Sequence, residues 1–225
     1  MKQSTTHYPI VEHCDAITLV GGSELGLNDL NICLTFAPSV VAADGGADWL
    51  LDAGMTPLAV IGDMDSLSDR ARDTFADLIQ TVTDQDTTDF EKCLAALRAP
   101  LILAVGFLGA RLDHTLATLA AVARSRAYHV VLVSASEVCV LARPGHSQIA
   151  APHNTRVALM PLGDAVVTTA GLVWDMDVMD LAPDGRVSSS NRAARDRIDL
   201  TIDGPVLITL EPQGLRGAID YALGQ

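Results

Sequence analysis

Continuous apolar runs alternate with amphipathic segments along the chain as far as residue 142. The runs are apolar throughout rather than at every second position, which is typical of strands buried on both faces of a parallel sheet. They lie at 16–22, 40–46, 58–63, 101–107, 129–134 and 137–142. Because the segments between them carry apolar residues at helical spacing, the pattern predicts a doubly wound α/β domain.

Local end signals support helices in four of the intervening segments. The first, 47–54, stops at Gly54 ahead of a proline. Ser68 is a suitable N-cap for the second, and Thr88 with Glu91 forms a capping box at the start of the third. The fourth, 111–127, is expected to present one apolar face made of Leu112, Leu116, Leu119 and Ala123.

The pattern changes near Arg143. Residues 142–154 are rich in turn formers, and helical periodicity nearly vanishes beyond them. Short strand-like runs separated by Gly, Pro and Asp predict a small antiparallel β-sandwich there. We therefore expect an α/β protein with an N-terminal doubly wound, mostly parallel sheet domain at 1–143 and a C-terminal sandwich at 144–225.

The composition of the chain indicates which kinds of binding partner and which cellular location to expect. The 225 residues include 28 acidic and 15 basic ones, for a net charge of −13, so nucleic-acid binding is a poor expectation. The four cysteines lack metal-site spacing and are expected to be buried free thiols. Because we find neither a signal-peptide run nor an apolar stretch of about 18 residues, we expect a cytoplasmic protein with no membrane contact.

Acidic and glycine-rich clusters follow several predicted strands, at the sheet edge where open α/β folds bind ligands. They supply Asp44, Gly45, Gly46, Asp63, Asp65, Asp89, Arg111, Asp113 and His114. Carboxylates that converge at one edge repel one another unless cations lie between them. Such oxygen ligands suit Mg²⁺, which commonly binds a few carboxylates together with substrate phosphates.

Each cluster taken alone has an ordinary structural alternative. Asp89 in a first helical turn could simply complement the helix dipole. Asp63 and Asp65 could be turn residues. His114 could be a general base or a helix-capping residue. Only the combination of clusters favours a metal site.

The scarcity of lysine excludes the commonest phosphate-binding loop. The chain has two lysines and no GxxxxGK[ST] motif, so it is not a P-loop enzyme. We expect metal ions, Arg111 and Lys92 to neutralise a bound polyphosphate. Neither a GxSxG elbow nor zinc-type histidine spacing is present, which leaves little support for nucleophilic or zinc chemistry.

Six motifs, in this order, resemble the thiamine pyrophosphokinase family. They are ADGGAD at 43–48, VIGDMDS at 60–66, DQDTTDFEKCL at 84–94, GARLDH at 109–114, GLVWDM at 171–176 and VSSSN at 187–191. Any one of the four in the first domain is a weak signal, but together they are highly specific. The resemblance runs from about residue 40 to residue 191, which is most of the chain.

The resemblance implies an activity and a set of partners. The family transfers a diphosphoryl group from ATP to the hydroxyethyl arm of thiamine, with Mg²⁺, and releases AMP. It also implies a homodimer with shared active sites. Val173 and Thr118 depart from the family pattern, which commonly has lysine and asparagine at these places.

Residue roles follow from the same resemblance. Catalytic roles are implied for Asp63, Asp65, Asp89, Asp113 and Arg111, with Mg²⁺ held by Asp63, Asp65 and Asp89. ATP contacts are implied for Asp44, Gly45, Gly46, Gln85, Lys92, Arg111 and His114. Thiamine contacts are implied for Trp174, Ser189, Ser190 and Asn191.

Two other functions stay open on the sequence. One is a nucleotide- or metal-binding sensor without turnover, because fold alone does not establish catalysis. The other is a different Mg²⁺-dependent diphosphotransferase or nucleotide hydrolase. Trp174 could also be a tryptophan of the sandwich core, and 188–191 a polar turn.

Overall fold

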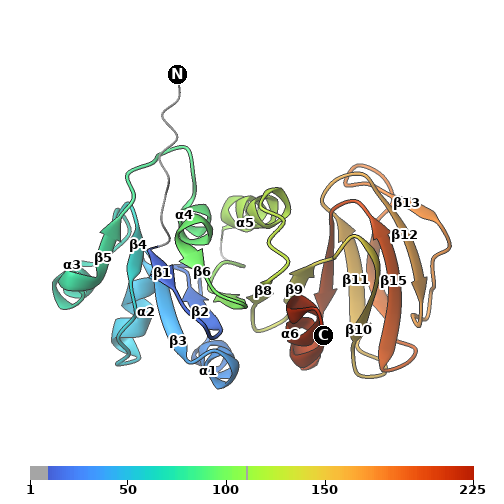
Figure 1. Cartoon of the computed structure of the whole chain (residues 1–225), viewed down its shortest axis with the longest axis horizontal. Coiled ribbons are helices and arrows are strands. Elements are labelled where there is room, and N and C mark those ends of the chain that lie inside the picture. The colour runs from blue at the N-terminus through green and yellow to red at the C-terminus, as the bar shows by residue number, and fades with distance from the viewer. Residues whose placement is uncertain (1–9, 110) are drawn as a thin grey trace. The chain divides into compact units, whose positions relative to one another are not determined.

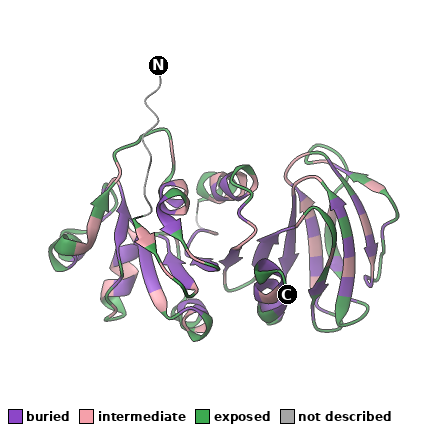
Figure 2. Cartoon of the chain, in the orientation of Figure 1, coloured by how far each residue is buried: buried purple, intermediate pink, exposed green. Residues whose placement is uncertain are grey.

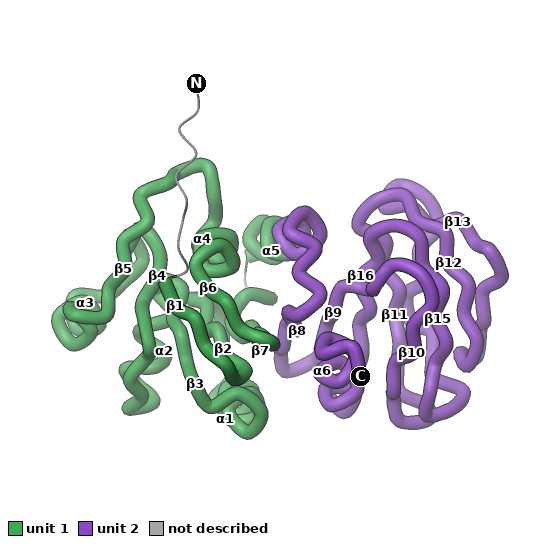
Figure 3. The backbone as a smooth tube through the Cα atoms, in the orientation of Figure 1, with its two compact units in different colours: residues 1–118 green, residues 119–225 purple. Residues whose placement is uncertain are grey.

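The computed structural model describes residues 10–109 and 111–225, and Figure 1 labels their helices and strands. Contacts within the chain divide it into two compact units, residues 1–118 and 119–225 (Figure 3). The division falls inside helix α5 (Leu112–Arg124), ahead of the turn-rich segment near Arg143.

Five parallel strands form the main sheet of the first unit, in the order β7-β2-β3-β4-β5. Their bounds are β2 Ile17–Val20, β3 Ser39–Ala43, β4 Val60–Gly62, β5 Ile79–Thr81 and β7 Ile102–Val105. Strands β2, β4 and β7 are buried along their whole length (Figure 2), as continuous apolar runs require when both faces of a sheet are covered. The more polar β5 closes the sheet and was not predicted.

Five helices and one short turn of 3₁₀-helix accompany these strands. They are α1 Leu27–Phe36, α2 Gly46–Asp52, α3 Asp69–Thr74, α4 Asp89–Ala96, α5 and 3₁₀ Ala76–Leu78, and strand β1 Val11–Glu12 pairs with β6 Leu97–Arg98. Both predicted caps are confirmed. The Ser68 side chain accepts a hydrogen bond from the backbone N–H of Ala71, and Thr88 and Glu91 form the capping box of α4.

The expected apolar face of α5 is only partly correct. Leu112 and Leu116 are 71% and 56% exposed, whereas Ala121 and Val122 are buried. The buried surface of this helix therefore lies toward its C-terminal half, because burial depends on which neighbours the helix meets rather than on apolar spacing alone.

The second unit is antiparallel. One sheet has the order β14-β11-β16-β9-β8, and the other has the order β10-β15-β12-β13. Their bounds are β8 Val130–Val133, β9 Val138–Leu141, β10 Gly145–Ala150, β11 Arg156–Pro161, β12 Ala165–Ala170, β13 Met179–Leu181, β14 Ser188–Arg192, β15 Arg197–Asp203 and β16 Val206–Leu210. Buried and more exposed residues alternate along β11, β12 and β15 (Figure 2), as in sheets with one face in the core.

The expected direction of two strands was wrong. The runs at 129–134 and 137–142 form β8 and β9, which pair with each other antiparallel, and β9 pairs antiparallel with β16. A continuous apolar run shows that a strand is buried on both faces but carries no information about its direction. The parallel pairing of the first unit therefore does not continue through these two strands.

A C-terminal helix, α6 (Leu215–Leu223), was not predicted. It packs against β8, β9 and β10, and a Cβ on Gly217 would lie 1.8 Å from the carbonyl oxygen of Ala150. This close approach requires glycine, which weakens the helical pattern in the sequence. Within residues 10–109 and 111–225, we find no helix with the length and apolarity needed to cross a bilayer.

Candidate active site

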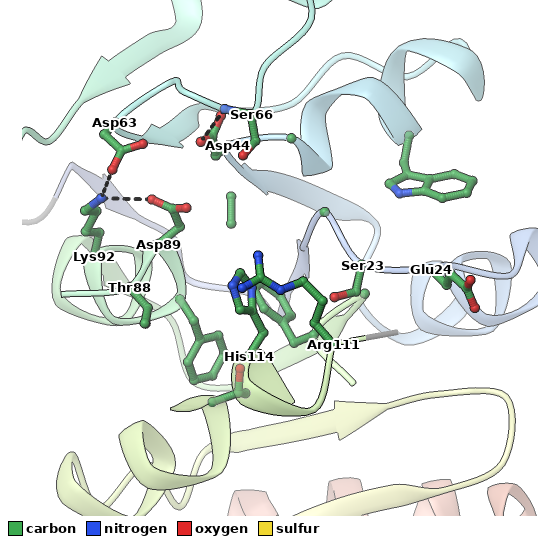
Figure 4. Close-up of a pocket in the computed structure, with 18 of the residues that line it drawn as sticks. Ser23, Glu24, Asp44, Asp63, Ser66, Thr88, Asp89, Lys92, Arg111 and His114 are labelled. Carbon is green, nitrogen blue, oxygen red and sulfur yellow. Dashed lines mark hydrogen bonds and ion pairs between the residues drawn. The ribbon is translucent and has the colours of Figure 1, made fainter. Parts of the chain in front are cut away.

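Loops at the carboxyl ends of the parallel strands enclose a cavity of about 660 Å³ in the first unit (Figure 4). This is where open α/β sheets bind ligands. Of the residues expected in the site, the cavity is lined by Asp44, Gly45, Asp63, Asp89, Lys92, Arg111 and His114. The size lies within the range of ordinary small-molecule sites.

Asp44, directly after β3, is the most constrained carboxylate in the cavity. It is 2% exposed, and its backbone adopts the left-handed conformation with φ of 42°. Its Oδ2 accepts a hydrogen bond of 3.2 Å from the backbone N–H of Ser66, but its buried Oδ1 has no hydrogen-bond partner. The pKa of Asp44 is raised to about 6, mainly by burial and also by the neighbouring carboxylates of Asp89, Asp65 and Asp63, against the opposing Ser66 bond.

Asp44, Asp63 and Asp65 form a three-carboxylate cluster. Each offers one oxygen, and the three oxygens lie within 4.8 Å of one another. A buried carboxylate oxygen without a partner costs free energy unless a cation or donor compensates it. Three hard oxygen ligands and this unpartnered atom fit a divalent cation such as Mg²⁺.

Lys92 on α4 joins two of the expected ligands. Its ammonium group donates to Asp63 Oδ2 at 2.7 Å and to Asp89 Oδ1 at 3.0 Å, and its side chain is 2% exposed. Burial lowers the pKa of Lys92, but the two carboxylates outweigh that effect and raise it, while the bond from Lys92 lowers the pKa of Asp63. The sequence expectation placed Asp89 on the metal; in this structure it is ion-paired with Lys92 at the edge of the three-carboxylate cluster.

Arg111 and His114 lie across the cavity from this ion pair (Figure 4). Arg111 Nη2 donates to Asp113 Oδ2 at 2.6 Å, and both side chains are about two-thirds exposed. The bond to Arg111 lowers the pKa of Asp113. Asp113 thus holds the guanidinium of Arg111 rather than joining the three-carboxylate cluster.

Close packing requires glycine at two positions near the site, whereas Gln85 makes only one long contact there. A Cβ on Gly46 would lie 2.0 Å from the carbonyl oxygen of Val20, so the start of α2 presses directly onto β2. A Cβ on Gly62 would lie 2.9 Å from the Cβ of Asp44. Gln85 is exposed and its Nε2 lies 3.5 Å from Asp63 Oδ2.

Comparison with known proteins shows which family the chain belongs to. The family model described as "Thiamin pyrophosphokinase, catalytic domain" matches residues 30–133, and "Thiamin pyrophosphokinase, vitamin B1 binding domain" matches residues 146–207. Thiamine pyrophosphokinase 1 of Arabidopsis thaliana is 30% identical over 207 residues, covering 76% of this chain and 76% of that protein. The chain belongs to the thiamine pyrophosphokinase family.

Further members of the thiamine pyrophosphokinase family are similar to this chain in sequence or in fold. Thiamine pyrophosphokinase 1 of Oryza sativa subsp. japonica is 29% identical over 208 residues, covering 76% of this chain and 77% of that protein. The structure of thiamin pyrophosphokinase from Candida albicans superposes with a TM-score of 0.77 at 17% identity and covers 91% of this chain and 94% of that one. This likeness shows that the fold is the mixed α/β fold of the family.

The segment that matches the vitamin B1 binding domain contains the four residues expected at thiamine. Trp174 is 62% exposed, so the alternative that it belongs to the sandwich core is wrong. Asn191 is 4% exposed; its Oδ1 accepts from the backbone N–H of Trp174 at 3.2 Å, and its Nδ2 donates to the Trp174 carbonyl at 2.8 Å. Asn191 therefore holds the backbone that presents the indole, while Ser189 and Ser190 are exposed.

Several contributors to these sites were not selected from the sequence. Asp175 closes the loop before Trp174 by accepting from the Thr169 hydroxyl and the backbone of Gly171 and Leu172. The cavity of the first unit is also lined by Ser23, Glu24, Trp49, Ser66, Thr88 and Thr118. Ser66, Thr88 and Asp175 lie inside family motifs and could have been found there, and Thr118 was noted only as a departure from the family pattern. Ser23, Glu24 and Trp49 are brought to the cavity only by the fold.

Proposed function

We propose that this chain transfers a diphosphoryl group from ATP to the hydroxyethyl group of thiamine, giving thiamine diphosphate and AMP. The observation that carries the proposal is the three-carboxylate cluster, with the unpartnered buried oxygen of Asp44, beside a cavity large enough for a small-molecule substrate. Membership of the thiamine pyrophosphokinase family supports the same reaction.

In the proposed reaction, the thiamine hydroxyl oxygen forms a bond to the β-phosphorus of ATP. The bond from that phosphorus to the oxygen bridging to the α-phosphorus breaks, AMP leaves with the bridging oxygen, and the proton of the thiamine hydroxyl is released to solvent. Such a transfer needs alignment and charge neutralisation more than covalent chemistry from the protein. Mg²⁺, when bound, supplies positive charge to the transferring phosphates.

The residues of the first unit divide these tasks. We assign Asp44, Asp63 and Asp65 as ligands of the metal ion. Asp89, which shares the Lys92 ammonium with Asp63, is assigned as a further ligand of the same ion. Lys92 holds Asp63 and Asp89 in place through its two ion pairs. We assign the nucleotide phosphates to Arg111, which Asp113 orients, and to Gly45, Gly46, Gln85, Lys92 and His114.

Trp174 supplies the proposed thiamine contact. An exposed indole can lie against the flat aminopyrimidine or the cationic thiazolium of thiamine. Ser189 and Ser190 are assigned to polar contacts, and Asn191 keeps the indole segment in place.

The remaining parts of the proposal concern organisation. We assign ATP and Mg²⁺ to a doubly wound domain at 1–143 and thiamine to a sandwich domain at 144–225. The protein is proposed to act in the cytoplasm as a homodimer with shared active sites. Sedimentation at micromolar concentration should then show a dimer; a fully active monomer would remove the shared-site arrangement.

The direct test is to incubate purified protein with thiamine, ATP and Mg²⁺ and to separate the products. Thiamine diphosphate and AMP in equal amounts support the proposal. An Asp63→Asn variant prepared in parallel controls for contaminating enzymes, and excess EDTA should stop the reaction. Binding of ATP without any product would favour a sensor, and ATP cleavage independent of thiamine would favour a hydrolase.

A further inference from the structure

Trp49 contributes an indole to the cavity that no step of the proposed reaction uses. The cavity has two other aromatic residues, Phe90 and Phe107, and these are 3% and 9% exposed. Their rings pack on each other with centroids 4.8 Å apart, which accounts for both as core contacts. Trp49 is only partly buried and lies on the cavity wall.

The packing of α2 holds this indole on the cavity side. Trp49 lies about one helical turn after Gly45, which is the N-cap of α2. Gly45 also lines the cavity. Gly46 faces the sheet, where a Cβ would lie 2.0 Å from the carbonyl oxygen of Val20. The helix therefore has no room to shift toward β2, and this fixes the position from which Trp49 lines the cavity.

Trp49 shares its end of the cavity with the loop after β2. A Cβ on Gly22 would lie 3.5–3.6 Å from Gly45 and Gly46, so this loop runs alongside the start of α2. The next residues of the loop, Ser23 and Glu24, also line the cavity. Figure 4 shows both on the side away from Asp63, Asp89 and Lys92.

The cavity therefore has one end with the carboxylates and Lys92 and another end with the indole of Trp49, beside Ser23 and Glu24. A nucleotide also has two unlike ends, because its triphosphate is anionic and its base is a flat π-system. With the triphosphate at the carboxylates and the metal ion, the base has to occupy another part of the same cavity. An indole face suits any base, since stacking on an aromatic side chain needs no particular hydrogen-bonding edge.

We propose that Trp49 is the stacking platform for the base of the nucleotide substrate. This assignment rests on the proposed function for the position of the triphosphate. It makes Trp49 a source of nucleotide affinity and not of base selection. Loss of one base-stacking contact should weaken binding about 5- to 100-fold.

Inorganic tripolyphosphate separates the base from the phosphates and so tests this assignment. We would titrate ATP and tripolyphosphate, each with Mg²⁺ and without thiamine, into the wild type and a Trp49→Leu variant by calorimetry. The variant should bind ATP about 5- to 100-fold more weakly. Its affinity for tripolyphosphate should change less than about twofold, and Trp49→Phe should recover part of the ATP affinity because it restores an aromatic face.

A second measurement uses the native indole and does not depend on the folding of a Trp49 variant. The chain has two tryptophans, so Trp174→Phe leaves Trp49 as the only indole fluorophore. AMP and ATP should then change the emission on binding, whereas tripolyphosphate should bind with little change. Equal responses to ATP and tripolyphosphate, or equal loss of both affinities in Trp49→Leu, would overturn the assignment.

The test of the Trp49 assignment can fail or succeed independently of the test of the proposed function. Base-dependent binding through Trp49 without formation of thiamine diphosphate would refute the activity and leave the platform intact. If the wild type forms thiamine diphosphate and Trp49→Leu binds ATP as tightly as the wild type, the activity is supported and the stacking role of Trp49 is refuted.

Discussion

Replacing Asp44 by asparagine should stabilise the metal-free protein while abolishing its activity. Asp44 is 2% exposed, and its pKa is raised from an ordinary 3.8 to about 6, first by burial and then by neighbouring carboxylates. The folded state therefore holds this proton more tightly than the unfolded chain does. Stability from this group is present below pH 3.8 and is lost as the pH rises through about 6.

The magnitude follows from the size of the shift. A rise from 3.8 to about 6 corresponds to a loss of about 3 kcal/mol once the group is ionised in both states. Asparagine keeps an oxygen for the Ser66 N–H bond and carries no charge. At pH 7.5 the free energy of unfolding of Asp44→Asn should exceed that of the wild type by about 2–3 kcal/mol. The corresponding rise in Tm is roughly 5–10 °C for a chain of this size.

Urea unfolding in excess EDTA at pH 4 and pH 7.5 would measure this difference. We expect the two proteins to differ little at pH 4 and most at pH 7.5. Asp73→Asn, an exposed position on α3 with the same change of charge, should stay within about 0.5 kcal/mol of the wild type at both values. Added Mg²⁺ should stabilise the wild type more than Asp44→Asn. A variant that is no more stable than the wild type at pH 7.5, or that has the same pH dependence, would refute the account of Asp44 as a repelled, buried carboxylate.

Three further predictions concern other parts of the site. Asp63→Asn or Asp65→Asn should abolish turnover with an unchanged circular dichroism spectrum, because a metal ligand is worth several kcal/mol in the transition state; near-normal rates at limiting Mg²⁺ would contradict this. Trp174→Ala should raise the thiamine KM about 3- to 30-fold. Its Tm should barely change since the indole is 62% exposed, and unaltered thiamine KM would move the thiamine site elsewhere. Asn191→Ala removes both hydrogen bonds to the Trp174 backbone and should cost about 1–3 kcal/mol of stability and raise the thiamine KM, with the ATP KM unaffected. Ser189→Ala is its exposed control, and equal melting curves for these two variants would remove the role given to Asn191.

The parts of the fold that were predicted correctly depend on local interactions. The N-cap at Ser68 and the capping box at Thr88 need only side chains and backbone groups within one helical turn. The buried strands were predicted because a short apolar run bounded by Gly or Asp is typical of a strand inside a core. The alternation of β2, β3, β4 and β7 with α2, α3, α4 and α5 was predictable for the same reason, whereas α1 and β5 were not predicted.

The errors concern partners distant in sequence. The antiparallel pairing of β9 with β16 joins residues 138–141 to residues 207–210, and nothing in either segment specifies the direction of the other. Helix α6 was missed because Gly217, which its close contact with β10 requires, interrupts the apolar pattern. In α5 the spacing was correct, but Leu112 and Leu116 are exposed because no described neighbour covers them.

The sequence by itself determined which side chains of the site exist and at which strand ends they lie, because motif spacing and strand ends are local properties. It therefore predicted a metal-dependent phosphoryl-transfer site, and the resemblance of its motifs supplied the substrate. Only the tertiary structure decided which contacts each group makes there. The buried Oδ1 of Asp44 has no hydrogen-bond partner, and Lys92 is ion-paired with Asp63, 29 residues away in the chain. Trp49 lines the same cavity as the carboxylates. These properties depend on burial and on distances between separate strands and helices, which no local pattern encodes.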